Sequence, residues 1–157
     1  MMEFNKKVIF IIKRCFFLIS IISIISCQGS LFSYQGRTVD PDRRIDLLEG
    51  GPHEGTWQTF DLTINYQYEK KAGILQLSGV TELSLHYKSN YEVLRHFFLT
   101  LFFLDNEGKV QEGKLIFNAS ASGLDDQVSF KKRFEIPLGA VSMAFHYDIG
   151  VQEGRRR

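Results

Sequence analysis

The sequence has little net charge and only a short apolar run. Its 19 Lys and Arg residues are balanced by 18 Asp and Glu residues, which gives a formal charge of +1. A nucleic-acid-binding protein needs a basic face, so this balance argues against nucleic acid as a partner.

The apolar run from Cys15 to Ile25 has 11 residues, two of them serine, whereas a transmembrane helix needs about 20. Lys13 and Arg14 stand before it, and a charge pair inside a span is costly, which disfavours a stable membrane span.

The sequence also lacks the common catalytic and metal-binding motifs. It contains no G-x-S-x-G nucleophile elbow, no HxH or HExxH pair, and no Gly-rich loop that leads from a strand into a helix and would hold a phosphate. The four histidines are His53, His86, His96 and His146. We therefore expect a protein that is not an enzyme and has neither a cofactor nor a metal. An envelope enzyme with an unrecognised site is the alternative.

One acidic group has a spacing that a calcium ion could use. Asp40, Asp42 and Asp46 stand at i, i+2 and i+6 in "DPDRRID", and Ca²⁺ takes six to eight oxygen ligands. However, the glycine and the closing glutamate of a calcium loop are missing, and Arg43 and Arg44 would oppose a cation. The segment is therefore predicted to be a solvated loop.

The N-terminal segment has the layout of a secretory signal peptide. Four cations precede the apolar run, and they are Lys6, Lys7, Lys13 and Arg14. A basic region followed by a short apolar region and a small-residue cleavage site is typical of such leaders. A buried strand is the other interpretation of an Ile-rich run of this length. The order of basic and apolar residues favours the signal peptide, at residues 1–26, with its apolar part helical.

The end of this run resembles the lipobox of bacterial lipoproteins. The four residues are Ile24-Ile25-Ser26-Cys27, an aliphatic residue, a tolerant position, a small residue and then cysteine. The resemblance implies cleavage between Ser26 and Cys27, a diacylglyceryl group on the Cys27 sulfur and often a third acyl chain on the new amine. Each buried acyl CH₂ contributes about 0.8 kcal/mol, so two or three chains anchor the protein firmly. A plain signal peptide and an uncleaved anchor are the alternatives.

The resemblance also implies where the protein is found. It predicts a lipid-anchored protein of the cell envelope, attached to the membrane through Cys27. Residue 28 is Gln and not Asp, and an aspartate there resembles the inner-membrane retention signal of Gram-negative lipoproteins. The protein is therefore expected at the outer membrane if the organism is Gram-negative. Cys15 would leave with the leader, so no thiol would remain for a disulfide, a nucleophile or a metal.

The remainder is large enough for one domain. Without residues 1–26, 131 residues remain with a formal charge of about −2, which is sufficient for a hydrophobic core. Residues 27–55 are rich in Gly, Pro, Asp and Arg and are predicted to be a lipidated tether and irregular lead-in. Residues 56–150 are predicted to form the domain, and residues 151–157 a basic C-terminal tail.

The domain segment has the alternation of β-strands. In "DLTINYQY" the apolar residues occupy every second position, which predicts a half-buried strand. Strands are expected at 61–68, 74–87, 91–105, 110–121, 128–136 and 140–149. With short polar turns between them, they predict an all-β protein, an antiparallel β-sandwich of about six to seven strands. A flattened barrel is the alternative.

The stretch "LTLFFLDNEGKV" resembles the strand–turn–strand of the FxLYD domains, immunoglobulin-like domains of bacterial envelope proteins. Phe102, Leu104, Asp105 and Gly108 carry the likeness, although Leu104 stands where that pattern has a tyrosine. The resemblance covers about a dozen residues and implies an immunoglobulin-like sandwich.

The segment "FFLTLFFL", from Phe97 to Leu104, is apolar on both faces. This predicts a central strand that is buried on both sides, and the other interpretation is a surface for a partner or an acyl ligand. We expect a non-catalytic binding, assembly or scaffolding module of the envelope, with a possible protein partner. The alternative is a carrier or sensor of an apolar ligand held between the sheets by Phe97, Phe102 or Phe145.

Overall fold

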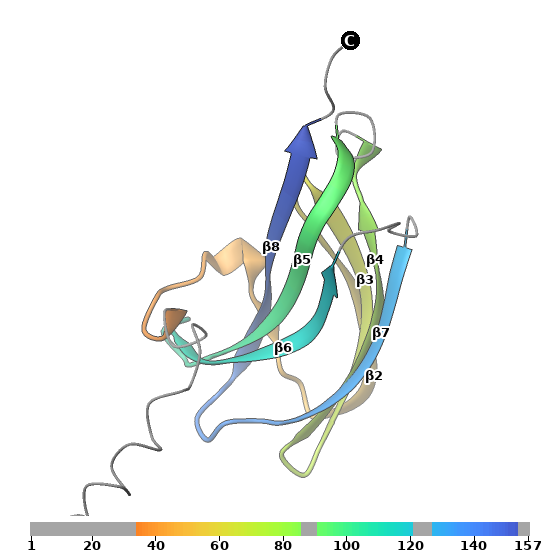
Figure 1. Ribbon diagram of the computed structural model, residues 1–157. Coiled ribbons are helices and arrows are strands. Elements are labelled where there is room, and N and C mark those ends of the chain that lie inside the picture. The colour runs from red at the N-terminus through yellow and green to blue at the C-terminus, as the bar shows by residue number, and fades with distance from the viewer. Residues whose placement is uncertain (1–33, 86–90, 121–126, 154–157) are drawn as a thin grey trace, which may run out of the picture. The chain divides into compact units, whose positions relative to one another are not determined.

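The computed structural model describes residues 34–85, 91–120 and 127–153 (Figure 1). The predicted leader 1–26, its helix, and Ser26 and Cys27 lie outside the described residues. None of the helices in the part of the chain that the structure describes has the length and hydropathy needed to cross a bilayer.

Two four-stranded antiparallel sheets pack face to face (Figure 1). In spatial order, the first sheet contains β1 (Ile45–Asp46), β8 (Ser142–Glu153), β5 (Tyr91–Leu104) and β6 (Val110–Ser120). The second sheet contains β2 (Gly50–Gln58), β3 (Leu62–Lys71), β4 (Ile74–Leu83) and β7 (Gln127–Glu135). The predicted antiparallel β-sandwich is confirmed, with eight strands instead of six to seven.

The core lies between the sheets and follows the predicted alternation. On β3, Leu62, Ile64, Tyr66 and Tyr68 face the core, while the residues between them face outward. Aromatic rings meet across the two sheets, at centroid distances of 5.8 Å for Trp57–Phe145, 6.3 Å for Phe117–Phe130 and 6.4 Å for Phe103–Phe134. Such pairs add to the free energy of area burial because their edges and faces carry opposite partial charges.

Strand β5 is buried on both faces, as the run "FFLTLFFL" predicts. Its inward residues join the core, and its outward residues Phe102 and Leu104 form a second cluster with Val110 and Ala144. The segment Tyr34–Arg44, here called the strap, lies over this cluster through Tyr34 and Val39. The strap contains the short 3₁₀ helix η2 (Pro41–Arg43).

Backbone hydrogen bonds hold the strap against the turn between β5 and β6. Gly36 N donates to Val110 O at 2.8 Å, Val110 N donates to Arg37 O at 2.9 Å, and Val39 N donates to Gly108 O at 2.9 Å. The Arg44 guanidinium donates twice to Val39 O, at 2.6 and 2.8 Å. The strap thus covers the outer side of β5 without being a full strand itself.

The sheets begin earlier in the chain than predicted. Strands β1 and β2 lie mostly within residues 27–55, which were expected to be irregular. Strand β2 has no apolar alternation, but its partner β3 supplies a regular ladder from His53↔Tyr68 to Gln58↔Thr63, so pairing overrides local propensity. Of the lead-in residues, Leu47 is buried, whereas Leu48 is exposed.

The predicted bounds of two other elements were wrong. Strand β4 ends at Leu83, opposite Leu62, because β3 begins there and offers no further partner. Leu85, expected in phase with the core, is therefore 82% exposed. At the other end, β8 runs to Glu153, so residues 151–153 of the predicted tail belong to a strand.

The turns between β3 and β4 and between β5 and β6 are short and well defined. Ala72 (φ 50°) and Gly73 (φ 74°) join β3 to β4 in a two-residue turn with two left-handed residues, which matches the twist of a hairpin. In the β5–β6 turn, Asp105 Oδ1 accepts from the amides of Glu107 and Lys109, and Gly108 has φ 78°. These turns fix the register of the strands that they join.

Candidate functional site

The outer face of the β2–β3–β4–β7 sheet is polar. Because the buried residues of β3 point into the core, Asn65, Gln67 and Glu69 point to the outer side. The strand pairing extends this assignment to the neighbouring strands.

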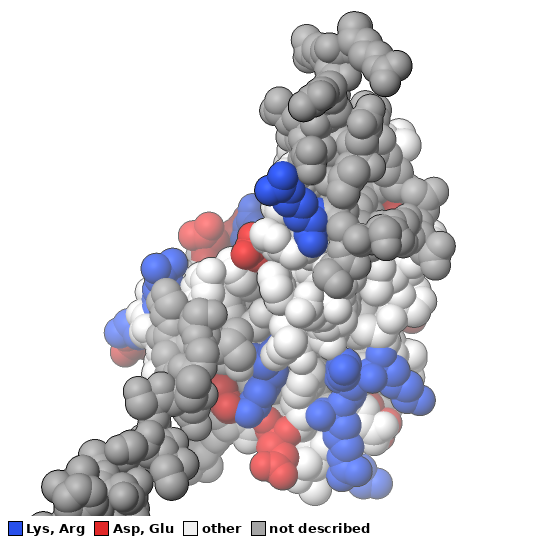
Figure 2. Space-filling view, viewed as in Figure 1, with Lys and Arg blue, Asp and Glu red and all other residues white. Residues whose placement is uncertain are grey.

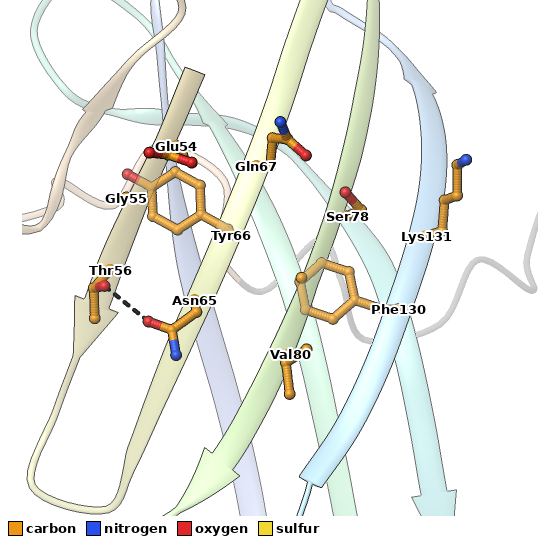
Figure 3. A pocket seen from close by; sticks show the side chains of 11 residues that line it. Glu54, Gly55, Thr56, Asn65, Tyr66, Gln67, Ser78, Val80, Phe130 and Lys131 are labelled. Carbon is orange, nitrogen blue, oxygen red and sulfur yellow. Dashed lines mark hydrogen bonds between the residues drawn. The ribbon is translucent and has the colours of Figure 1, made fainter. Parts of the chain in front are cut away.

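Two rows of outward side chains cross this sheet. The first row pairs Glu54 with Gln67, Gln67 with Ser78, and Ser78 with Lys131. The second row contains Thr56, Asn65 and Val80. Figure 3 shows both rows side by side, and the Thr56 hydroxyl donates to Asn65 Oδ1 at 2.8 Å. The two rows form the walls of a shallow groove.

The residues between the two rows point the other way. This middle row runs Gly55–Tyr66–Gly79–Phe130. A Cβ on Gly55 would lie 2.5 Å from the Tyr66 hydroxyl, and one on Gly79 would lie 2.7 Å from the Phe130 ring, so each ring packs on the inner side of a glycine. Burial, and to a smaller extent the nearby Tyr68, raises the pKa of Tyr66. The groove floor is therefore backbone.

The groove forms an open cavity of about 820 Å³. A second cavity of about 240 Å³ continues it along the strands and shares Gln67, Ser78 and Lys131 with it. The second cavity adds Glu69 and Gln76, which form a further outward row with Arg133. The lining offers amide and hydroxyl donors and acceptors with a few charges, an arrangement suited to binding a polar ligand.

This face carries charges of both signs, and they include Lys71 on β3 and Glu135 on β7, which share the outward register. Glu54 and Glu69 lie on β2 and β3, whereas Lys131 and Arg133 lie on the edge strand β7. Figure 2, which is viewed from the side of β8 and β5, shows Lys and Arg side chains at its lower right, at the edge where β7 runs in Figure 1. No described residue forms an ion pair or hydrogen bond with the side chain of Lys131 or Arg133. These two cations are available to a ligand.

The aspartates considered for calcium lie in the strap and in β1. Asp40, Asp42 and Asp46 are exposed and belong to consecutive short elements. Within the described residues, no three side chains of His, Cys, Asp or Glu come close enough to hold a metal ion.

The described histidines lie in three different environments. His53 contacts the Tyr68 ring at 5.0 Å, and His96 lies over Gly150, 3.5 Å from the Asp148 carboxylate. His86 lies outside the described residues. The histidines that the sequence offers as ligands are thus not gathered at one site.

His146 is part of an aromatic stack under the strap. Its ring stacks on the Phe102 ring at a centroid distance of 5.0 Å and meets the Tyr34 ring at 4.6 Å. The Arg37 guanidinium lies over the same Tyr34 ring, 5.1 Å from its centroid. Burial lowers the pKa of His146, Asp148 opposes this shift, and Arg37 adds to it. The imidazole is therefore held in its neutral form and acts as a packing group.

The aromatic residues considered for an apolar pocket do not come together. Phe97 and Phe145 lie in the core between the sheets, with 1% and 4% exposure. Phe102 lies on the opposite side of its sheet, under the strap.

The groove was missed by sequence reasoning, although one signal was present. Its residues occupy the polar positions of alternating strands, which look like ordinary solvent-facing residues. The two-residue turn at Ala72–Gly73 fixes the register of β3 and β4, and it would have placed Gln67 beside Ser78. The contribution of β2 and β7 depends on pairing that the sequence does not specify.

The comparisons with known proteins add no relative. No family model, no curated protein and no solved structure matches this chain.

Proposed function

We propose that this chain is a lipid-anchored protein of the bacterial cell envelope, with a β-sandwich that acts as a non-catalytic binding module. The observation that carries the binding role is the open polar groove, to which all four strands of one sheet contribute. The lipobox-like sequence Ile24-Ile25-Ser26-Cys27 supports the anchor.

The strap determines on which side of the sandwich the described chain begins. Six residues separate Cys27 from Tyr34, which allows a reach of at most about 25 Å. Tyr34 packs on the outer side of the β1–β8–β5–β6 sheet. The described part of the chain therefore begins on the side of the sandwich opposite the groove.

Metabolic labelling with palmitate tests the anchor in cells that express the full chain. Wild type and Cys15→Ser are expected to take up label and to sediment with membranes. Cys27→Ser is expected to lose the label and to be released in soluble form. Because Cys15 lies in the same leader, it is the matched control for loss of a thiol. Labelling of Cys27→Ser at the wild-type level would contradict the proposal.

A further inference from the structure

Two cations lie at one end of the groove. Lys131 and Arg133 are two positions apart on β7, so they lie on the same side of the strand, roughly 7 Å apart along it. Both lack an ion-pair or hydrogen-bond partner among the described residues. A carboxylate between them would gain charge-assisted hydrogen bonds, which are stronger than neutral ones.

The rest of the groove is lined by neutral polar groups. Gln67, Ser78 and Gln76 lie next to the cations, and Thr56 and Asn65 lie on the far wall. Because Asn65 accepts from Thr56 through its oxygen, its NH₂ group is left to donate outward. These side chains match a ligand that carries many hydroxyl or acetamido groups.

The groove lacks the anchors of a protein interface. Among its lining residues, Val80 is the one apolar side chain with outward register, because Tyr66 and Phe130 belong to the inward row. Binding energy between proteins is concentrated in buried aromatic and other large side chains. A hydroxyl-rich ligand is therefore the better occupant.

We propose that this groove binds a short acidic oligosaccharide that crosses the four strands, with a sugar carboxylate held by Lys131 and Arg133. The row from Glu54 to Lys131 spans three strand spacings, roughly 14 Å, which is long enough for several sugar units. The proposal deepens the binding role proposed above and does not depend on the lipid anchor.

A second copy of the chain fits the same face less well. Glu54 and Glu69 of one copy would face Lys131 and Arg133 of another, but two concave faces would meet only at their rims. Stable interfaces need close shape complementarity at their centre. An added peptide strand is also excluded within the face, because the backbones of β3 and β4 are already paired on both sides.

Calorimetric titration of the detergent-purified full chain tests this proposal. The probes are the trimer of galacturonic acid, the neutral trimer of N-acetylglucosamine, and hexaglutamate as an acidic peptide. The acidic trisaccharide is expected to bind more tightly than the other two. Lys131→Gln and Arg133→Gln are each expected to weaken its binding about tenfold or more, because each removes a charge-assisted hydrogen bond.

Lys132→Gln is the matched control. This lysine lies between the other two on the same strand and is exposed, but its register places it on the opposite side of the sheet. Its replacement is expected to leave the affinity unchanged, as is Cys27→Ser, which separates this test from that of the anchor. Equal losses for all three charge variants, equal binding of the neutral sugar or the peptide, dimerisation through this face in light scattering, or no binding at all would each overturn the proposal.

Discussion

The Tyr147 hydroxyl donates a 2.6 Å hydrogen bond to the Asp61 carboxylate and so ties one sheet to the other. Tyr147 lies on β8, and Asp61 lies in the turn between β2 and β3. The Tyr147 ring also meets the Trp57 ring edge-on at 6.3 Å. Burial first, and then the bond to Asp61, raise the pKa of Tyr147, so the phenol stays protonated and remains a donor.

Removal of this hydroxyl is expected to destabilise the sandwich. Tyr147→Phe keeps the ring contacts but loses a hydrogen bond to a charged acceptor, so the free energy of unfolding should fall by about 1 kcal/mol. Urea denaturation measures this change. In the Asp61→Asn background, the same substitution should cost less, because its partner is no longer charged. Equal costs in both backgrounds would show that the ion–dipole contact contributes nothing.

Because the half-buried His146 imidazole is neutral, the free energy of unfolding is expected to depend on pH. The native pKa is lowered from its usual value of 6.5, mainly by burial, so the unfolded state binds more protons at mildly acidic pH. The stabilising contribution is thus fully present above about pH 6.5 and is lost as the pH falls from there toward the native pKa. Denaturation curves at pH 7.5 and pH 5 should therefore differ more for wild type than for His146→Gln. An unchanged difference in the variant would contradict this assignment.

Gly79 is expected to tolerate no side chain. A Cβ there would lie 2.6 Å from the Asn65 carbonyl oxygen and 2.7 Å from the Phe130 ring. Gly79→Ala should therefore cost about 1–3 kcal/mol of overpacking, measured by urea denaturation. Gly113→Ala is the matched control, because Gly113 also lies within a strand but its nearest neighbours would be 3.2 Å from the new Cβ. Chain entropy favours alanine over glycine at both positions, so a loss as large at Gly113 would show that the Phe130 contact is not the cause.

The residue after the predicted lipidation site sets an expected location. Gln28→Asp should move the protein from the outer-membrane to the inner-membrane fraction when it is expressed in a Gram-negative host. Gln28→Asn, which has the same shape without the charge, is the control and should stay with the outer membrane. Sucrose-gradient fractionation with immunoblotting measures the distribution. If both variants fractionate with wild type, the outer-membrane prediction drawn from Gln28 is wrong.

The strands that the sequence predicted are those whose own residues alternate. Strand β3 shows this best, since Leu62, Ile64 and Tyr68 are buried as its pattern requires. Strand β2 was missed because it is an edge strand with two initial glycines and a proline, and only pairing with β3 makes it extended. The end of β4 was missed for the related reason that a strand stops where its partner stops.

The alternation of apolar and polar residues could not predict the strap that covers the outer side of β5, and it could not predict the groove. The run from Phe97 to Leu104 indicates burial on both sides, but the strap that buries its outer side has no periodicity of its own. The groove arises from the register of four strands, and its outward residues differ in no local property from other solvent-facing residues. Besides the Ala72–Gly73 turn, the glycines at 55 and 79 are unusual within strands, but they do not by themselves indicate a groove.

The attachment of the strap also determines how the molecule would respond to a load. A pull on the chain before Tyr34 acts on the backbone hydrogen bonds that join Gly36, Arg37 and Val39 to the β5–β6 turn. These hydrogen bonds can break one after another. Strand β5 is paired with β8 and β6 along most of its length. Pulling it out of the sheet would require many backbone hydrogen bonds to break at once. Under tension, the strap would therefore detach first and lengthen the tether, while the sandwich stays folded.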